Sequence, residues 1–217
     1  TIVRWPFGIA AAGLSKADVI QKFIAVNYPY TKVVALHHNI GNAFRGELSD
    51  LDVLHELFDG VDLIYDATAE IGLQHLLSDI AAEQNVPYVC VSATPGGWGG
   101  LIGRIRPGMG NGCWACLQRH LMDLSIPCPP NSPAGAIQPH GCADPTFTGA
   151  GFDIGQIALA GVRLAVASLS QGTQAGYPDF EWDIGVIALR DTDGKAIAPH
   201  WKTFPLTRHP KCTCGNS

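Results

Sequence analysis

The sequence predicts an α/β fold, with a mostly parallel sheet, helices on both faces and later antiparallel strands. Two apolar runs, 61–68 and 87–94, enclose a helix-like segment at 70–85, which is the pattern of a βαβ unit. Alternating segments at 101–107 and 181–190 are typical of antiparallel strands. With 217 residues, 47% of them hydrophobic and 15% charged, the chain is long and apolar enough for a folded core.

The remaining elements follow from local signals. Ser15 precedes an apolar-faced segment that stops at Pro29, and Asp18 lies three residues further on, so a helix capped by Ser15 is expected. A 23-residue stretch at 125–147 contains six prolines and is predicted to be a flexible crossover-type loop. The other expected elements are a short strand at 32–38, a short helix at 50–58 and a long helix rich in small residues at 151–170.

Composition excludes several classes of protein. The net charge is −5 and no two Lys or Arg residues are adjacent, which argues against a partner that is a nucleic acid or an anionic membrane. No apolar run approaches the roughly 18 residues of a membrane span, and no signal peptide is recognised. Seven cysteines, an odd number, favour metal-bound or reactive thiols in a reducing, cytoplasmic setting over a disulfide framework.

Four cysteines form two pairs that could bind one metal ion. Cys113 and Cys116 form a CxxC motif, and Cys212 and Cys214 form a CxC motif 95 residues further on. Four thiolates in a tetrahedron are the usual ligands of a closed, structural zinc site, so the sequence predicts a four-cysteine zinc knot. His209 could replace one sulfur, and a redox CxxC with an incidental tail is the alternative.

Charged side chains at element ends are candidate nucleotide ligands. Asp66 ends the run at 61–68, where a carboxylate could bind magnesium carrying nucleotide phosphates; the alternative is an N-cap for the next helix. Lys16 lies in the first turn of its helix, where the helix dipole disfavours a cation, so it is either a phosphate ligand or a solvated surface residue. Arg4 is either a bidentate phosphate binder or a surface residue with a buried stem.

Glycines and loop thiols supply further candidates. The segment TPGGWGG at 94–100 is interpreted as a tight connection whose glycines allow positive φ, with contact to a ligand as a weaker hypothesis. Cys142 and Cys128 lie in the proline-rich loop, where a thiol is either a nucleophile or incidental. Cys90 lies inside an apolar strand and is expected in the core.

The order of these motifs resembles the ThiF/MoeB/HesA family, the ubiquitin-activating-enzyme-like adenylyltransferases. The resemblance spans nearly the whole chain and includes GLSKA, YDATAE, CWAC and the terminal CxC. It implies one Rossmann-like activating domain over 1–217, usually dimeric, with ATP, magnesium and structural zinc as cofactors. It also implies adenylation of the C-terminal carboxylate of a ubiquitin-like or sulfur-carrier protein, in some members followed by thioester transfer to a cysteine.

The resemblance assigns roles to particular residues. Arg4 and Lys16 resemble phosphate-binding residues, Asp66 resembles the magnesium-associated aspartate of a D-x-T-D-N motif, and Cys142 is favoured over Cys128 for a thioester. The zinc ligands would be Cys113, Cys116, Cys212 and Cys214.

The sequence also departs from the family pattern. The glycine-rich strand–turn–helix would precede Thr1, so we expect upstream sequence to be missing; Thr1 stands for Asn in N-x-x-R, and Ala69–Glu70 stand for Asp-Asn. A non-catalytic, zinc-stabilised relative that binds a carrier or partner protein is therefore the second hypothesis. A nicotinamide-dependent oxidoreductase is the third, although GxGxxG is absent from these residues and the four cysteines would stay unexplained.

Overall fold

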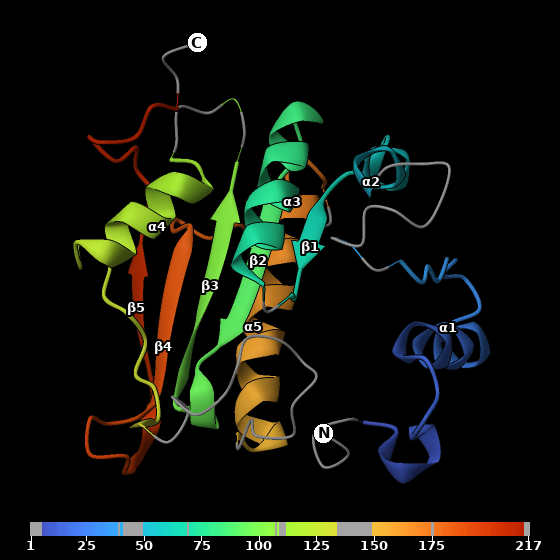
Figure 1. Cartoon of the computed structure of the whole chain (residues 1–217), viewed down its shortest axis with the longest axis horizontal. Coiled ribbons are helices and arrows are strands. Elements are labelled where there is room, and N and C mark those ends of the chain that lie inside the picture. Colours follow the sequence, from blue (N-terminus) through green and yellow to red (C-terminus); the bar gives the residue numbers. More distant parts are fainter. Residues whose placement is uncertain are drawn as a thin grey trace. The chain divides into compact units, whose positions relative to one another are not determined.

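This computed structural model contains a five-stranded mixed sheet, in the order β1-β2-β3-β4-β5 (Figure 1). The structure describes residues 6–38, 40, 50–68, 70–106, 108, 112–133, 149–174 and 176–214. They fall into two units, 1–57 and 58–217, and each is described by itself.

The sheet belongs to the second unit. β1 (Ile64–Asp66) pairs in parallel with β2 (Tyr88–Ala93), and the three later pairs are antiparallel. The later strands are β3 (Gly99–Ile105), β4 (Ile184–Arg190) and β5 (Ala196–Phe204). The α/β class is thus confirmed, but within the described residues only one of the four strand pairs is parallel, so the antiparallel part is larger than the sequence predicted.

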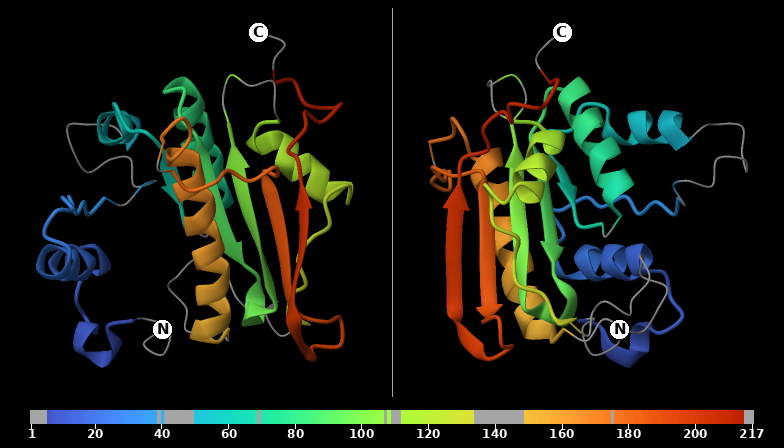
Figure 2. Two further views of the ribbon diagram at one scale, coloured as in Figure 1. Left: turned by 180° about the vertical axis from the view of Figure 1, so that it is seen from behind. Right: turned by 60° about the vertical axis from the view of Figure 1, so that its left-hand side comes forward.

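Helices cover both faces of the sheet. α3 (Ile71–Glu83) and α4 (Trp114–Met122) lie on one face, and α5 (Gly151–Leu169) lies on the other, as Figures 1 and 2 show. α3 contacts β1 and β2, whereas α5 contacts β2 and β3. The core between α5 and the sheet contains the fully buried side chains Val89, Ile102, Ile157, Leu164 and Ile187.

α5 has an apolar outer side as well as a buried inner side. By length and composition alone it could cross a membrane, which differs from the sequence analysis, because the short polar interruptions at Asp153, Gln156 and Arg163 do not lower its mean hydropathy enough. Its inner side packs on the sheet through Ile157 and Leu164, so we interpret it as a core helix of the α/β fold.

The first unit contains η2 (Gly8–Ala11) and α1 (Lys16–Asn27). Ser15 Oγ accepts a hydrogen bond from Asp18 N at 3.3 Å, so the predicted cap is confirmed. α2 (Asp50–Phe58) is confirmed as well. The predicted strand at 32–38 is wrong: the described residues offer it no partner strand, and an extended segment without a ladder is not a β-strand.

Three further differences concern the second unit. The strand predicted at 61–68 is shortened to β1, because only Ile64–Asp66 pair with β2. α4 was not predicted, although its nine residues include one cysteine of the CxxC motif. β5 was not predicted either, because it is largely exposed and contains Pro199.

Candidate functional site

Four thiols meet at one end of the second unit. Cys113 is the N-cap residue of α4 and Cys116 lies in its first turn, while Cys212 and Cys214 lie on the segment 205–214 that follows β5, here called the C-terminal arm. The Sγ atom of Cys113 lies 3.7 Å from that of Cys116 and 3.7 Å from that of Cys212, and the Sγ atoms of Cys116 and Cys214 are 3.3 Å apart. All four sulfur atoms lie within 4.8 Å of one another.

These distances fit a tetrahedral metal site. A zinc ion bound by four sulfurs at about 2.3 Å would place each pair of sulfurs about 3.8 Å apart. The four predicted ligands are thus brought together across 95 intervening residues of chain, and they could hold a metal ion.

The thiols do not share one environment. Burial raises the pKa of Cys113 well above its usual range. Desolvation acts in the same direction on Cys212, but the Cys214 backbone N–H and the neighbouring thiols donate hydrogen bonds that lower the pKa of Cys212 to about 6. A metal ion binds thiolates, so the lowered pKa of Cys212 favours the form of this thiol that a metal ion binds.

Local packing explains why the arm reaches α4. Gly112 N donates to Leu206 O at 2.8 Å, and a Cβ atom at Gly112 would lie only 2.5 Å from Thr207 O. Leu206 is buried, and its N–H donates to Asp183 Oδ2 at 3.2 Å. Glycine before Cys113 therefore permits the close approach that brings the two cysteine pairs together.

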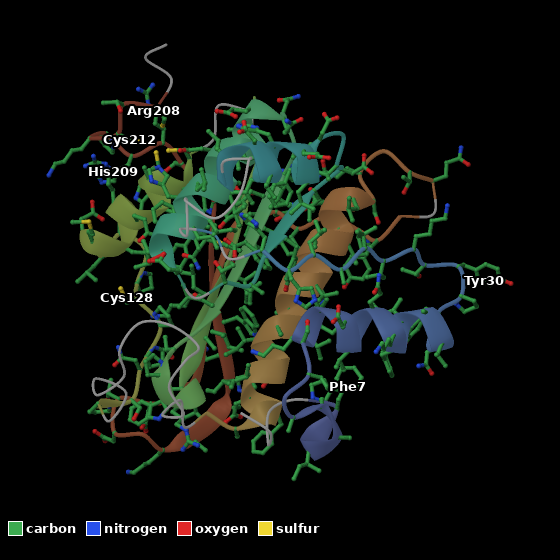
Figure 3. All side chains as sticks on the ribbon, turned by 45° about the vertical axis from the view of Figure 1, so that its right-hand side comes forward. Phe7, Tyr30, Cys128, Arg208, His209 and Cys212 are labelled. Atoms are coloured by element: carbon green, nitrogen blue, oxygen red, sulfur yellow. The ribbon has the colours of Figure 1, made fainter. Side chains whose placement is uncertain are left out.

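His209 is not a member of the sulfur cluster. The structure places it beside the C-terminal end of α4, where His209 Nε2 lies 2.9 Å from Asp123 Oδ2. Figure 3 shows His209 and Cys212 close together, with Cys128 on the segment that leads away from α4. The alternative in which His209 replaces a sulfur is not supported, because four thiols already complete the set.

Asp66 lies at the carboxyl end of β1, as predicted, but it is buried. Its side chain is 1% exposed; Thr68 N donates to Oδ1 at 2.7 Å and Tyr88 Oη donates to Oδ2 at 2.6 Å. Desolvation, the nearby Cys90 thiol and this hydrogen bond raise the pKa of Tyr88. Within the described residues, Asp66 therefore presents no solvent-facing oxygen, and magnesium does not fit there without rearrangement.

The N-cap alternative for Asp66 is wrong. Glu70 caps α3 instead, because Glu70 Oε2 accepts hydrogen bonds from Gly72 N at 2.7 Å and Leu73 N at 3.3 Å. The carboxylate of Glu70 is exposed, whereas that of Asp66 is enclosed.

The glycine-rich connection lies after β2, at the same edge of the sheet as Asp66. Gly96 and Gly97 have φ values of 78° and 66°, so the predicted positive φ is confirmed. The loop packs against residues 130–132: Thr94 Oγ1 donates to Pro130 O at 2.5 Å, and Ser132 N donates to Pro95 O at 3.0 Å. Residues 130–132 of the loop predicted to be flexible are thus fastened to this end of the sheet.

The other candidate residues lie in different units or outside the described residues. Lys16 is exposed at the start of α1, in the first unit. Arg4 and Cys142 lie outside the described residues, as does the whole of the loop segment 134–147. Cys128 is exposed, and Cys90 is buried, where desolvation and the nearby Asp66 carboxylate raise its pKa to about 12.

A buried ion-pair network escaped the sequence analysis. Arg104 is fully buried, and Arg104 Nη1 lies 2.6 Å from Asp179 Oδ1. Arg106 Nη2 lies 2.6 Å from Asp183 Oδ1, and Asp183 in turn accepts from Leu206 N. The network links β3 to the beginning of the C-terminal arm. No local sequence signal reveals it, because the partners lie about 75 residues apart.

The fold and the sulfur cluster define a class: an α/β protein with a mixed sheet and a closed four-cysteine centre. The family model described as "ThiF family" matches residues 6–214, so the chain belongs to the ThiF family. Two proteins of Sinorhizobium fredii (strain NBRC 101917 / NGR234) are similar to it. The uncharacterized protein y4oA is 32% identical over 222 residues, and y4qC is 35% identical over 224 residues. These matches cover 99% and 98% of this chain but only 37% of each relative.

Solved structures show the same fold. E. coli MccB with ATP superposes with a TM-score of 0.58 at 15% identity, covering 93% of this chain and 50% of that one. The microcin C7 biosynthetic enzyme MccB in complex with N-formylated MccA gives a TM-score of 0.56 at 14% identity, with 92% and 51% covered. The chain thus spans about half of these proteins and about a third of the relatives from S. fredii.

Proposed function

We propose that the protein containing this chain uses ATP to adenylate the C-terminal carboxylate of a small partner, either a peptide or a carrier protein. A carboxylate oxygen attacks the α-phosphorus of ATP, the bond from that phosphorus to the pyrophosphate oxygen breaks, and the products are an acyl adenylate and pyrophosphate. Both reacting groups are anions, so the site must supply positive charge that brings them together and stabilises the leaving pyrophosphate.

The observation that carries this proposal is the family match, which extends over both units from residue 6 to residue 214. The fold neighbours support it: MccB is described with ATP and with its peptide MccA. Lys16 and Arg4 would supply the positive charge. The carboxyl edge of β1 and β2, where ligands bind in open α/β sheets, would face the nucleotide.

The finer assignments belong to the same proposal. The partner would be a ubiquitin-like or sulfur-carrier protein, and the acyl group would pass to Cys142 or Cys128 as a thioester. Zinc would occupy the four-thiolate centre, where it would supply no chemistry and would fix the arm to α4. ATP would arrive with magnesium, and the protein would act as a cytoplasmic homodimer without nucleic-acid or membrane partners.

A second candidate function is favoured by one observation. Asp66 is enclosed, with both carboxylate oxygens accepting hydrogen bonds, and Ala69 and Glu70 follow it in place of Asp and Asn. A non-catalytic relative that binds a carrier or partner protein without adenylating it would retain the fold and the metal centre. In such a protein Asp66, at the carboxyl end of β1, would stabilise the fold and would not bind nucleotide.

Carboxylate-dependent ATP–pyrophosphate exchange distinguishes the adenylating enzyme from the non-catalytic binding protein. The intact protein is incubated with ATP, labelled pyrophosphate and the small-protein and peptide fraction of its source cell. Exchange is expected with the untreated fraction and is expected to disappear when carboxypeptidase has removed the C-terminal residues. Binding of a component from that fraction without any exchange would contradict adenylation and support the second candidate.

Two variants test the nucleotide edge. Asp66→Ala is expected to abolish exchange, whereas Tyr88→Phe, which keeps the carboxylate but removes its hydroxyl partner, is expected to retain most of it. Near wild-type exchange in Asp66→Ala would show that Asp66 has no part in the reaction.

A further inference from the structure

A second cluster of polar side chains joins the C-terminal arm to α4, next to the sulfur cluster. It consists of His120, Asp123 and Ser125, from α4 and the turn after it, and of Thr207 and His209 from the arm. We infer that this cluster, here called the clasp, holds the arm against α4 independently of metal and so preorganises Cys212 and Cys214 for metal binding. His209 and Asp123 are its positioning residues.

His209 is bound on both sides of its ring. Lys211 N donates to His209 Nδ1 at 3.1 Å; since a backbone N–H can only donate, the ring proton belongs on Nε2, which donates to Asp123 Oδ2 at 2.9 Å. His209 is 5% exposed, and its ring packs edge-on against that of His120 at 4.9 Å between centroids. The ring of His209 is therefore fixed in position and orientation.

The backbone of His209 leads directly to a metal ligand. Cys212 N donates to His209 O at 2.9 Å, which closes the turn between them. Fixing His209 thus fixes the start of the turn that presents the Cys212 thiol. The clasp would act on the metal through the arm, without contacting it.

His120 makes the second connection. A carbonyl oxygen only accepts, so His120 Nε2 donates to Thr207 O, at 2.9 Å. His120 Nδ1 lies 2.7 Å from Ser125 Oγ. The arm is thus bound to α4 through one backbone oxygen and one side chain, at two positions that are separate from all four sulfurs.

The turn after α4 shapes the Asp123 side of the clasp. Asp123 Oδ1 lies 3.1 Å from Ser125 N and 2.7 Å from Ser125 Oγ, which leaves Oδ2 for His209. Leu124 between them has a φ of 60°, which is disfavoured for leucine. A disfavoured backbone conformation is retained where surrounding contacts determine it. Here those contacts are the hydrogen bonds of Asp123 with Ser125 and His209, which orient the Asp123 carboxylate toward the arm.

The same side chains could instead be read as a second metal site, since one donor atom from each of His120, Asp123 and His209 lies within 4.8 Å of the others. The hydrogen bonds argue against it. Each ring nitrogen of both histidines already has a protein partner. A metal on His120 Nε2 would leave Thr207 O without its donor, and a metal on His209 Nε2 would move the ring proton to Nδ1, where Lys211 N needs an acceptor.

Zinc affinity tests the inference. Zinc is titrated into the chelator-stripped, reduced intact protein against a competing chelator, for wild type, His209→Phe and Asp123→Ala. Loss of partners that orient metal ligands typically lowers metal affinity 10–100-fold, and a weakening of about tenfold or more is expected in both variants. His200→Phe and Asp193→Ala, at exposed positions on β5 and on the turn before it, should change the affinity less than twofold. Unchanged affinity in His209→Phe and Asp123→Ala would overturn the inference.

Hydrogen exchange tests whether the clasp works without metal. In the stripped wild-type protein the amides of Lys211 and Cys212, which donate to His209, should remain protected, and in His209→Phe that protection should be lost. Rapid exchange of these amides in the stripped wild type would show that metal alone holds the arm. The Asp123 side chain is about half exposed, so Asp123→Ala should fold. This variant therefore keeps the inference testable if His209→Phe fails to fold.

The number of zinc ions bound per chain tests whether His120, Asp123 and His209 form a second metal site. At saturating zinc, wild type and His209→Phe should bind the same number of ions. One ion fewer in His209→Phe would assign His120, Asp123 and His209 to a metal site and would overturn the clasp. None of these measurements involves ATP, so their outcome is independent of the proposed function.

Discussion

Tyr88 Oη donates to Asp66 Oδ2 at 2.6 Å and so joins β2 to the carboxyl end of β1. Asp66 Cα pairs in register with Cys90 rather than with Tyr88, so the tyrosine reaches the carboxylate diagonally across the ladder. β1 contains only three residues, and this hydrogen bond extends the connection between the two strands beyond the backbone ladder.

Removing the Tyr88 hydroxyl should destabilise the fold. Tyr88→Phe leaves a buried carboxylate oxygen without its donor, and a lost hydrogen bond of this kind costs about 1–3 kcal/mol in the free energy of unfolding. Urea denaturation measures it. Tyr65→Phe is the control, because Tyr65 is partly exposed and its hydroxyl makes only a 3.4 Å contact with Ala158 O. Equal, small effects of both substitutions would contradict the structural role of the Tyr88–Asp66 pair.

Two glycines of α5 should respond in opposite ways to alanine. A Cβ atom at Gly155 meets nothing within 4 Å, whereas one at Gly161 would lie 2.1 Å from Val91 Cγ2 and 2.7 Å from Tyr65 Oη. Gly155→Ala should stabilise the protein by about 0.5–1 kcal/mol through helix propensity. Gly161→Ala should destabilise it by about 1–3 kcal/mol through overpacking against β2. Thermal unfolding of the two variants, measured side by side, checks this prediction. A stabilising effect of Gly161→Ala would contradict the close packing of α5 on β2.

The cysteines should differ in reactivity. With metal bound, iodoacetamide should modify the exposed Cys128 and spare the four clustered thiols, and a chelator should release these four. Cys90 should stay unmodified in the folded protein in both conditions, because it is buried and its pKa is raised to about 12. Peptide mass spectrometry assigns each site. Modification of all four clustered thiols before chelation would mean that they do not bind metal as a set.

Acid should weaken the buried ion-pair network. Partial burial alone would raise the pKa of Asp179, but its hydrogen bond from Arg104 and the charges of Arg104 and Arg106 hold that pKa below its usual range. The stabilisation is therefore fully present above the unfolded-state value of about 3.9, and it is lost as the pH falls through the lower folded-state value.

The free energy of unfolding, measured by urea denaturation at successive pH values, should accordingly fall as the pH drops below about 4. Asp179→Asn should lower stability at neutral pH and reduce the steepness of the acid decline, whereas the surface variant Asp193→Asn should retain the wild-type slope. If the free energy of unfolding depended on pH equally steeply in Asp179→Asn and wild type, Asp179 would not contribute to the acid destabilisation.

Local patterns predicted α1, α2, α3 and α5 but not α4, and strand pairing was the harder problem. The α1 cap at Ser15 and the long α5 follow from spacing within one segment. The run at 32–38 has the composition of a strand, but a strand also needs a neighbour, and its own residues do not reveal one. β5 is the opposite case: its composition is unfavourable for a strand, but backbone pairing with β4 holds it in the sheet.

The candidate metal centre was predictable because cysteine spacing is itself a chemical signal. The hydrogen-bonded residues around it were not: His120 and Asp123 look like ordinary surface residues, and His209 could be proposed only as a substitute for one sulfur, until the arm folds back onto α4. The burial of Asp66 was hidden for the same reason, because its partner Tyr88 lies 22 residues away and serves as an apolar strand residue in the sequence pattern.

The sulfur centre also has a consequence for how the chain reaches its fold. β3 and β4 pair directly, yet Gly103 and its partner Ile184 are separated by 80 residues that include α4 and α5. A metal ion held by both cysteine pairs in the unfolded chain would close a ring of about 100 residues, and by analogy with a cross-link of that span it would remove about 4–5 kcal/mol of chain entropy from the unfolded ensemble. It would also shorten the path between β3 and β4 to about half, since the route through the metal avoids most of the intervening chain. Metal captured early would therefore speed the pairing on which the antiparallel half of the sheet depends.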